Sequence, residues 1–260
     1  MNRIIELVGL PGAGKSTLAP VLLQELQGHG GRWWPNDPAV IHCLRRRDDG
    51  ILRNLLKRFP FPVWEPISGS RFTLAELHAF SCAHSPLFAL VFELVSRENV
   101  PPQVRQCVLY ALFIHFAERQ LFDVHLKTGE GVIVEEGLAM GLLALLECLP
   151  LSASYEEEVA RYVHHMPALV GLVWVDADPA ECAARLRRRP QLPVPWAACS
   201  ERELIEHLER DRQGLAFVLA ECERRGIPCC RIPNSEGDAE SASRLLREQG
   251  RAWARLTEAR

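Results

Sequence analysis

Three features are missing from this sequence of 260 residues, and each absence excludes a class of protein. No stretch approaches the roughly 18 uninterrupted apolar residues of a membrane-spanning helix, and the amino terminus leads directly into an apolar strand pattern, so we expect neither a membrane span nor a signal peptide. The net charge is only −3 at pH 7, which argues against a surface devoted to binding nucleic acid. No linker or composition break divides the chain, so we expect residues 1–260 to form a single domain. Because we expect neither a membrane span nor a signal peptide, we expect the protein to be cytoplasmic.

The sequence also lacks a recognisable metal-binding pattern. It contains nine cysteines, but no two of them have the C-x-x-C spacing of zinc sites and redox motifs. Several lie within apolar helical patterns, so we interpret them as reduced thiols of the core, and the adjacent Cys229 and Cys230 have no role that the sequence identifies. His164 and His165 lack the i, i+4 spacing of a zinc pair. We therefore expect no structural metal.

The most informative segment is an apolar strand pattern at residues 4–8, followed by a glycine-rich loop and an amphipathic helix pattern at residues 15–27. The loop matches G-x-x-x-x-G-K-[ST] in the strand-to-helix context that this motif requires. Its glycines can adopt φ > 0 and have no Cβ, so successive N–H groups can surround a phosphate at the positive end of the helix. Lys15 can then neutralise β- and γ-phosphates, and the Ser16 hydroxyl can bind Mg²⁺. The predicted phosphate-binding residues are Gly9, Pro11, Gly12, Ala13, Gly14, Lys15, Ser16 and Thr17.

Carboxylates follow a second apolar, β-branched run at residues 131–134. This run is typical of a central parallel strand, and ligands bind beyond the carboxyl ends of such strands. Glu135 could bind Mg²⁺ through water or orient an acceptor, and Glu136 could do the same; alternatively, both belong to the first turn of a helix at residues 138–149. Asp37 could be a catalytic base or an acceptor ligand, or a turn residue before a proline.

Arginines cluster at the end of a helix pattern at residues 180–189, which follows a strand pattern at residues 169–175. The cluster suits a mobile lid, at residues 185–198, that closes over transferring phosphates. The alternative is a solvated helix end favoured by the helix dipole. A second basic segment, Arg45 to Arg58, is by default a solvated helical face.

Helix patterns occupy most of the remaining chain, at residues 73–84, 86–97, 102–128, 201–225 and 238–258, and one further strand is expected at residues 227–232. The helix at 102–128 is apolar on nearly every side, which predicts burial, while its few polar residues, among them Glu118 and Arg119, are expected to be exposed at its ends. Strands that alternate with helices imply a parallel sheet of about five strands with right-handed crossovers.

On these residues the chain resembles the P-loop kinases of the nucleoside and nucleotide kinase superfamily, the thymidylate-kinase-like proteins included. The resemblance covers most of the chain in outline, and the phosphate loop is its one specific motif. It implies an α/β three-layer sandwich with a helical acceptor-side insertion at residues 29–130, and ATP and Mg²⁺ as cofactors. It also implies the following roles: Lys15, Glu135, Asp37, Arg185 and Arg189 in catalysis, Ser16, Glu135 and Glu136 at the metal, and Arg188 and Asn234 at the donor nucleotide.

The turn after the second apolar run departs from the best-known members. Thymidylate kinases usually carry Asp-Arg-Tyr, and deoxynucleoside kinases Glu-Arg-Ser, where this chain has Glu135-Glu136-Gly137. The turn is more similar to the Asp-Glu-Gly of thymidylate-kinase-like proteins linked to surface polysaccharides or to phage DNA-base modification. The missing arginine makes a standard nucleoside monophosphate acceptor less expected.

The sequence therefore predicts an ATP- and Mg²⁺-dependent phosphotransferase that acts on a hydroxyl or phosphate of a nucleoside- or nucleotide-like acceptor, as a monomer or homodimer without a membrane partner. Two other acceptors remain open, a hydroxymethylated base in DNA and a small molecule of a glycan pathway. A nucleotide-dependent switch NTPase is the alternative of another class, although the chain lacks the Asn-Lys-x-Asp and Leu-Ser-Gly-Gly-Gln signatures.

Overall fold

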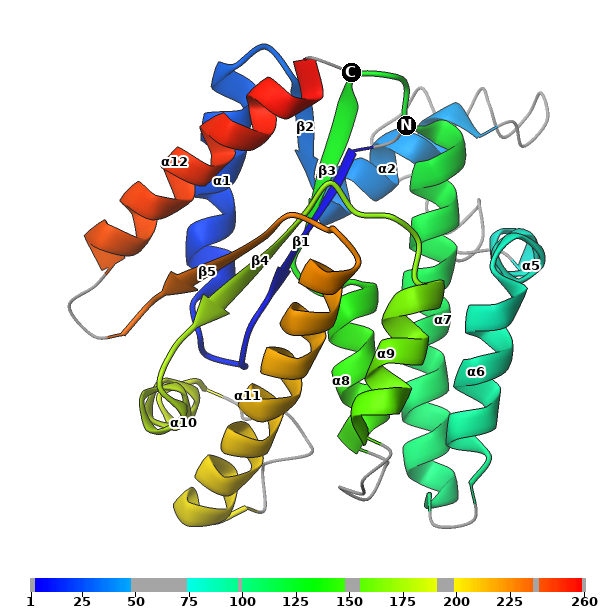
Figure 1. Ribbon diagram of the computed structural model, residues 1–260, viewed down its shortest axis with the longest axis vertical. Helices are drawn as coiled ribbons and strands as arrows, with labels where there is room; N and C mark the ends of the chain where they lie inside the picture. Colours follow the sequence, from blue (N-terminus) through cyan, green and yellow to red (C-terminus); the bar gives the residue numbers. More distant parts are fainter. Residues whose placement is uncertain are drawn as a thin grey trace.

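The protein is built on one sheet of five parallel strands, in the order β2-β3-β1-β4-β5 (Figure 1). The computed structural model describes residues 3–47, 74–97, 100–147, 155–190, 199–235 and 239–258. The strands are β1 (Arg3–Val8), β2 (Arg32–Pro35), β3 (Glu130–Val134), β4 (Gly171–Asp176) and β5 (Cys229–Pro233). The predicted α/β class, the parallel pairing and the strand number are confirmed.

The central strands are apolar because helices cover them on both faces. Five of the six residues of β1 and all residues of β3 and β4 are buried. Ile5 pairs with Ile133 of β3 on one side and with Gly171 of β4 on the other. Such continuous apolar runs are typical of parallel strands in the interior of an α/β sandwich.

Helices form the two outer layers, as the resemblance implies. On one face lie α1 (Lys15–Gly28) and α12 (Ala239–Glu258), which pack against each other. Trp253 of α12 is fully buried against Gly171, where a Cβ would come within 2.6 Å of the indole ring. On the opposite face lie α8 (Leu138–Glu147) and α11 (Glu201–Arg224), with α7 (Pro102–His125) and α9 (Tyr155–His165) packed beyond them (Figure 1).

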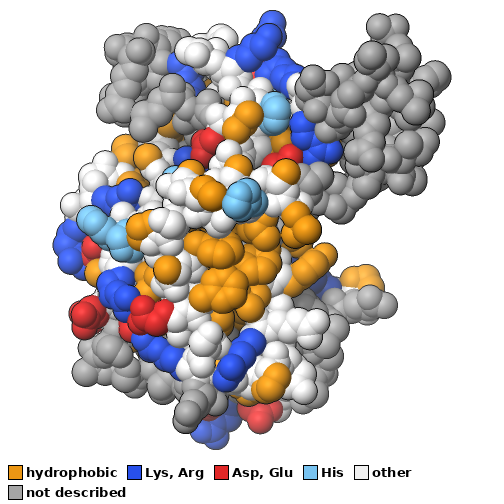
Figure 2. Space-filling view, turned by 90° about the vertical axis from the view of Figure 1, so that its right-hand side faces the viewer, with side chains coloured by type: hydrophobic (Ala, Val, Ile, Leu, Met, Phe, Trp, Pro, Cys, Tyr) orange, Lys and Arg blue, Asp and Glu red, His pale blue; other side chains and the backbone are white. Residues whose placement is uncertain are grey.

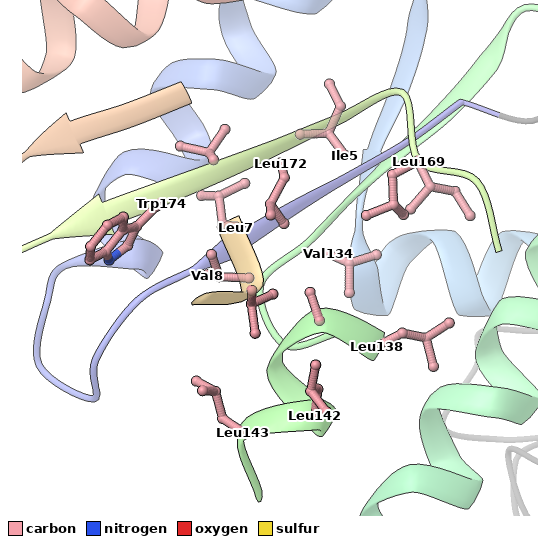
Figure 3. Packing of buried hydrophobic residues seen from close by; sticks show 14 of the residues in the cluster. Ile5, Leu7, Val8, Val134, Leu138, Leu142, Leu143, Leu169, Leu172 and Trp174 are labelled. Atoms are coloured by element: carbon pink, nitrogen blue, oxygen red, sulfur yellow. The ribbon is translucent and has the colours of Figure 1, made fainter. Parts of the chain in front are cut away.

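The core fills the space on both faces of the sheet. Ile5 and Leu7 of β1 point to the face covered by α1 and α12, whereas Val8 of β1, Leu172 of β4 and Leu138 at the start of α8 lie on the opposite face (Figure 3). All five side chains are at most 1% exposed. Because this core sits directly under the carboxyl end of β1, it gives the loop that follows β1 a rigid base.

Four further helices complete the described chain: α2 (Asn36–Arg46), α5 (Leu74–Ala83), α6 (Ser85–Val95) and α10 (Pro179–Arg187). The range 29–130 thus contains β2 as well as α2, α5, α6 and α7. The apolar residues that follow Pro38 lie inside α2. Pro35 ends β2, and the Asn36-Asp37-Pro38 sequence suits a helix start.

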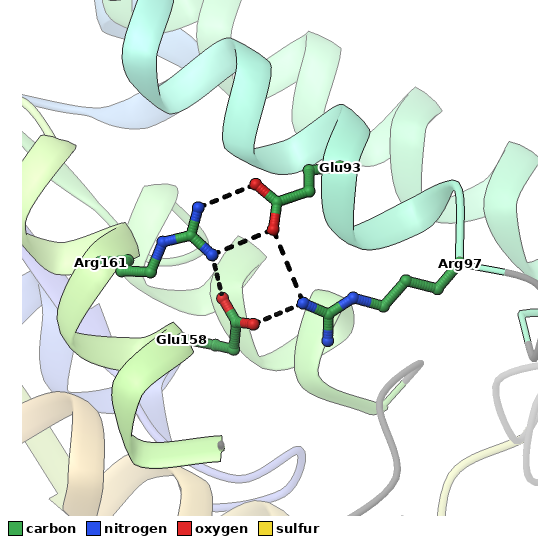
Figure 4. Close-up of polar contacts among 4 residues, drawn as sticks. All are labelled: Glu93, Arg97, Glu158 and Arg161. Atoms are coloured by element: carbon green, nitrogen blue, oxygen red, sulfur yellow. Dashed lines mark hydrogen bonds and ion pairs between the residues drawn. The ribbon is translucent and has the colours of Figure 1, made fainter.

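An ion-pair network joins α6 to α9. Arg161 donates hydrogen bonds to both carboxylate oxygens of Glu93, at 3.0 and 2.8 Å, and to Glu158 at 2.9 Å, while Arg97 also donates to Glu158 (Figure 4). Glu158 is buried and Glu93 is exposed. Partly exposed pairs of this kind add little stability singly, so the network mainly sets how the two helices meet.

Hydrophobic side chains gather on the side of the molecule that faces the viewer in Figure 2, where α5, α6 and α7 lie. Phe92, Val104 and Tyr110 are among the exposed ones, so α7 is less completely buried than its composition predicts. No single helix in the described ranges has the length and apolar composition to cross a membrane, although α5 and α6 together meet that test across a bend of 104°.

Two further expectations are corrected. Glu118 and Arg119 are 7% and 8% exposed, not solvated, because α7 is covered along this turn. Arg119 donates to Asp123 at 2.8 Å and to the carbonyl of Ala168 at 3.0 Å, which ties α7 to the segment before β4. Cys82 and Cys107 lie at the surface, not in the core, because their helices turn other side chains inward, such as Phe80 and Val108.

Glu130, at the start of β3, forms a buried pair with Arg46 of α2. Arg46 donates to both carboxylate oxygens, one of them at 2.9 Å, and the N–H of Lys127 donates at 2.9 Å. The hydrogen bonds from Arg46 lower the pKa of Glu130 from its usual 4.5 to about 2, against the opposing effect of burial.

We predict that Glu130→Gln lowers the free energy of unfolding at pH 7 by roughly 2 to 3 kcal/mol. Because the folded-state pKa lies below the unfolded one, this stabilisation is present above about pH 4.5 and is lost as the pH falls toward 2. Urea unfolding at pH 7, 5 and 3.5 should therefore show the two proteins converging at acid pH. Glu206→Gln, which removes an exposed pair with Arg202, is the control and should change stability by less than about 0.5 kcal/mol. A difference between wild type and Glu130→Gln that persists unchanged at pH 3.5 would contradict the assignment.

Candidate active site

A cleft of about 1180 Å³ lies beyond the carboxyl ends of the strands. It is lined by the loop after β1, the first turn of α2, one stretch of α7, the turn after β3, the end of α10 and the segment after β5. The predicted site residues that line it are Pro11, Gly12, Gly14, Lys15, Ser16, Thr17, Asp37, Glu135, Glu136, Arg185, Arg189 and Asn234. Side chains from six segments of the chain thus face one space, as expected where parallel strands end together.

The loop after β1 has the backbone conformation that its glycines predict. Gly12 and Gly14 have φ of 85° and 93°, in the left-handed region that favours glycine. Gly9 and Ala13 do not line the cleft but shape the loop: a Cβ on Gly9 would lie 2.5 Å from the carbonyl oxygen of Val175, and Ala13 N–H donates to Leu10 at 3.0 Å. Gly14 is the N-cap of α1 and has no side chain to accept hydrogen bonds from the first-turn N–H groups, which therefore face the loop.

Lys15 is 8% exposed, and its ammonium group donates to the carbonyls of Gly9 at 2.8 Å and Leu10 at 3.4 Å. Burial lowers the pKa of Lys15, while the carboxylates of Glu136 and Glu135 oppose that shift. The cation therefore lies inside the loop at the floor of the cleft, next to the two acids of the turn after β3.

Ser16 and Glu135 meet across 119 positions of sequence. The Ser16 hydroxyl donates to Glu135 Oε2 at 2.5 Å. A hydroxyl and a carboxylate side by side, with the carboxylate of Glu136 lining the same cleft, are the oxygen ligands that Mg²⁺ prefers in proteins. The predicted metal residues are thus brought together, and their donor set fits this ion.

Arg185 and Arg189 approach the loop from α10, whereas Arg188 does not. Arg185 donates to the carbonyls of Gly12 and Asn234, both at 3.2 Å, and pairs with Glu181. Arg189 lines the cleft, while Arg188 is exposed and is not among the lining residues. The predicted lid extends through residues 191–198, which lie outside the described residues.

Asn234 joins the end of β5 to the phosphate loop. Its side-chain amide donates to Ala13 O at 2.6 Å, its backbone N–H donates to Asp176 O at 2.7 Å, and a Cβ on Gly14 would lie 2.5 Å from its Nδ2. Position 14 therefore requires glycine for two reasons: its φ is left-handed, and the Asn234 amide occupies the space of a Cβ.

Asp176 is the last residue of β4 and pairs with two arginines. Arg212 of α11 donates to both of its oxygens, at 2.9 and 3.1 Å, and Arg231 of β5 donates at 2.9 Å. Burial opposes the ionised form of Asp176, but the hydrogen bonds from the two arginines outweigh burial and hold the pKa of this carboxyl below its usual value. The resulting cluster joins the end of β4 to β5, the strand that Asn234 follows.

The far half of the cleft contains residues that sequence reasoning missed. Asn36 and Asp37 in the first turn of α2 face His115 and Glu118 of α7, and the Asn36 amide donates to Glu118 at 3.4 Å. Asp37, unlike the other three, was a candidate from the sequence, and it lies in the first turn of α2 rather than in a turn. The one available signal for Glu118 was its position in an otherwise apolar helix.

Two arginines of the basic segment Arg45 to Arg58 form ion pairs with residues that do not line the cleft. Arg46 and Arg47 are paired with Glu130 and Glu76. Arg53, Lys57 and Arg58 lie outside the described residues.

No family model matches this sequence, and no curated protein does. Among solved structures, the chain is similar to deoxyadenosine kinase from M. mycoides with bound dATP, at 14% identity and a TM-score of 0.44, over 95% of this chain and 98% of that one. The same kinase with bound dCTP is similar at 12% identity and a TM-score of 0.44, over 96% and 99% of the two chains. A likeness of this degree does not by itself determine what the chain does.

We predict that Gly14→Ala lowers the free energy of unfolding by about 1 to 3 kcal/mol, since it forces a left-handed φ on alanine and displaces the Asn234 amide. Gly28→Ala is the matched control on the same helix, because a Cβ there meets no atom within 4 Å, and it should be neutral or stabilising by up to about 1 kcal/mol. Chemical denaturation of the two variants checks this. Equal stability of Gly14→Ala and wild type would contradict the close approach at position 14.

Proposed function

We propose that this protein is a nucleotide-dependent phosphotransferase, a P-loop kinase of the nucleoside and nucleotide kinase superfamily with a thymidylate-kinase-like turn after β3. One observation carries the proposal: a single cleft holds the phosphate loop with Lys15, two arginines and the carboxylates of Asp37, Glu135 and Glu136. A phosphoryl group in transfer needs positive charge around it and an acceptor held in line with the donor. This cleft supplies both kinds of group.

Three features support ATP as the donor and Mg²⁺ as its metal. The loop's N–H groups and the amino end of α1 form a cradle for phosphates, and the positive φ values of Gly12 and Gly14 shape it. The neighbouring oxygens of Ser16 and Glu135, with Glu136, suit Mg²⁺, which when bound neutralises charge on the donor phosphates. In the proposal, Asn234 borders the donor base and Arg188 contributes from the lid at residues 185–198.

The chain's own residues then have distinct roles in transfer. Lys15 neutralises the β- and γ-phosphates from below, and Arg185 and Arg189 neutralise charge as it spreads over the transferring oxygens. Glu135 or Asp37 accepts the proton of the acceptor hydroxyl or holds that hydroxyl in line. The buried position of Lys15 strengthens its charge interactions, because the local dielectric is low.

The acceptor lies, in this proposal, on the side formed by residues 29–130, against the first turn of α2 and the facing turn of α7. Its class is a hydroxyl or phosphate of a nucleoside- or nucleotide-like molecule. A hydroxymethylated base in DNA and a glycan-pathway molecule are the other acceptors to test. The protein would act in the cytoplasm as a monomer or homodimer.

A transfer assay with γ-labelled ATP and Mg²⁺ tests the proposal. The acceptor panel contains nucleosides, nucleotides, sugars and hydroxymethylated DNA. We predict that Lys15→Ala lowers the transfer rate by about 10²-fold or more, several kcal/mol of transition-state stabilisation. Lys127→Ala, at an exposed lysine away from the cleft, is the control and should retain wild-type activity. Near-normal transfer by Lys15→Ala would contradict the site assignment, and label released only as free phosphate would favour the switch NTPase instead.

The arginines of α10 provide a second prediction. Arg185→Ala and Arg189→Ala should each lower the transfer rate by about 10²-fold, because each removes a cation that lines the cleft. Arg187→Ala is the matched control two residues along, since its guanidinium donates to the carbonyl of Cys199 and does not line the cleft. Steady-state kinetics of the three variants distinguish the roles. A loss in Arg187→Ala equal to the loss in the other two would indicate a general effect of helix charge.

A further inference from the structure

Glu6, in the middle of β1, is a buried carboxylate with no part in the chemistry described so far. It is 2% exposed, in a strand whose other buried residues are all apolar. Its two oxygens accept hydrogen bonds from the first N–H groups of α8, from Leu138 at 3.0 Å and from Ala139 at 2.8 Å. A carboxylate on one strand therefore holds the amino end of a helix that follows another strand 132 positions later, and the helix dipole favours it there.

Gly137 is the residue that allows this contact. A Cβ at position 137 would lie 2.5 Å from Glu6 Oε1 and 2.8 Å from Oε2, closer than any real Cβ contact. Its φ is not positive, so space and not backbone conformation requires glycine here. The glycine of the Glu135-Glu136-Gly137 turn thus has a physical partner in β1.

Both ends of that turn are attached to the same residue. At one end, Glu6 pairs in the sheet with Val134, the last residue of β3. At the other end, its side chain holds Leu138, the first residue of α8. The only residues between these two attachments are Glu135, Glu136 and Gly137, so Glu6 spans the segment that carries both carboxylates into the cleft.

The surroundings of Glu6 keep its carboxylate in place. Burial raises the pKa of Glu6, and the Ala139 and Leu138 N–H groups, with Arg119 and His115 of α7, act against that shift. A cavity of about 20 Å³ beside it is lined by Glu6, His115, Glu118 and Arg119. His115 and Glu118 also line the main cleft, so the far half of the cleft borders the same polar pocket.

We propose that Glu6 is a positioning residue, which holds Glu135 and Glu136 in the orientation that metal and acceptor binding require. The inference rests on the proposed function of the cleft. It adds that the orientation of the two acids is set from β1, through the amino end of α8, and that Gly137 is required because Glu6 occupies the space of its side chain.

Glu6→Gln tests the proposal with nearly unchanged side-chain volume. The amide has one carbonyl oxygen, so it can accept from only one of the two N–H groups and turns its own NH₂ toward the other. We expect faster amide hydrogen exchange in residues 135–140 and an Mg²⁺ concentration for half-maximal transfer raised about 10- to 100-fold. The Kd of ATP measured in EDTA should stay at the wild-type value, because the phosphate loop is not touched.

Glu130→Gln is the matched control. It also removes a buried carboxylate from the sheet, but at the amino end of β3, away from the turn. It should lower stability and leave the Mg²⁺ requirement and the exchange of residues 135–140 unchanged. If Glu6→Gln and Glu130→Gln behave alike in these two measurements at equal fraction folded, Glu6 has only a structural role and the proposal is wrong.

A double-mutant cycle keeps the test independent of how well a single variant folds. Gly137→Ala should reproduce the effects of Glu6→Gln, because the new methyl group displaces the carboxylate. In a Glu6→Ala background, Gly137→Ala should raise amide exchange in residues 135–140 much less, since the clash with the carboxylate is gone. Additive effects of Gly137→Ala and Glu6→Ala on exchange in residues 135–140 would overturn the proposal.

The two proposals fail in different ways. If the wild-type protein transfers label to no acceptor, the proposed function fails, while the exchange measurement on Glu6→Gln, Glu130→Gln and the cycle still decides whether Glu6 holds the turn. If the wild-type protein transfers label and Glu6→Gln has a wild-type Mg²⁺ requirement, the proposed function stands and the positioning role fails.

Discussion

The position of β1 between β3 and β4 is the constraint on which the rest of the site depends. Because β1 is hydrogen-bonded to β3 on one side and to β4 on the other, its carboxyl end is fixed relative to both strands. The loop that follows β1 therefore begins between the ends of β3 and β4. The loop or the start of α1 therefore meets Glu135 after β3, Val175 of β4 and Asn234 after β5. A change of strand order would separate these groups while leaving every local motif intact.

Charge in the cleft is divided between two sides. Lys15, Arg185 and Arg189 lie at or above the loop, Asp37, Glu135 and Glu136 follow the ends of β2 and β3, and Glu118 faces them from α7. Several of these groups are held by neighbouring residues: Arg185 by backbone carbonyls, Glu118 by Asn36, and the turn of Glu135 by Glu6 and Ser16. Fixed groups of this kind can stabilise a charge distribution without reorganising when it forms.

Sequence reasoning was accurate for features that depend on residues close together in the chain, and it failed for contacts between residues far apart. The phosphate loop and α1 were predictable because their glycines, the helix start and the apolar strand are all local features within 28 residues. The alternation of strands and helices was predictable for the same reason, and it led to the parallel sheet. Glu118 and Arg119 were assigned to solvent because hydropathy describes a residue and not its neighbours, and in the structure those neighbours come from α2 and from the segment before β4.

By itself, the sequence determined the glycine-rich loop after β1, the parallel α/β sheet of five strands and the presence of acids at the end of β3, since each depends on short runs of residues whose preferences agree. Only the tertiary structure decided which distant residues meet: Ser16 with Glu135, Asn36 with Glu118, Arg46 with Glu130, and Glu6 with the space left by Gly137. The physical reason is that these contacts join residues far apart in the chain, at distances set by strand order and helix packing, and nothing in the local sequence of either partner specifies the other.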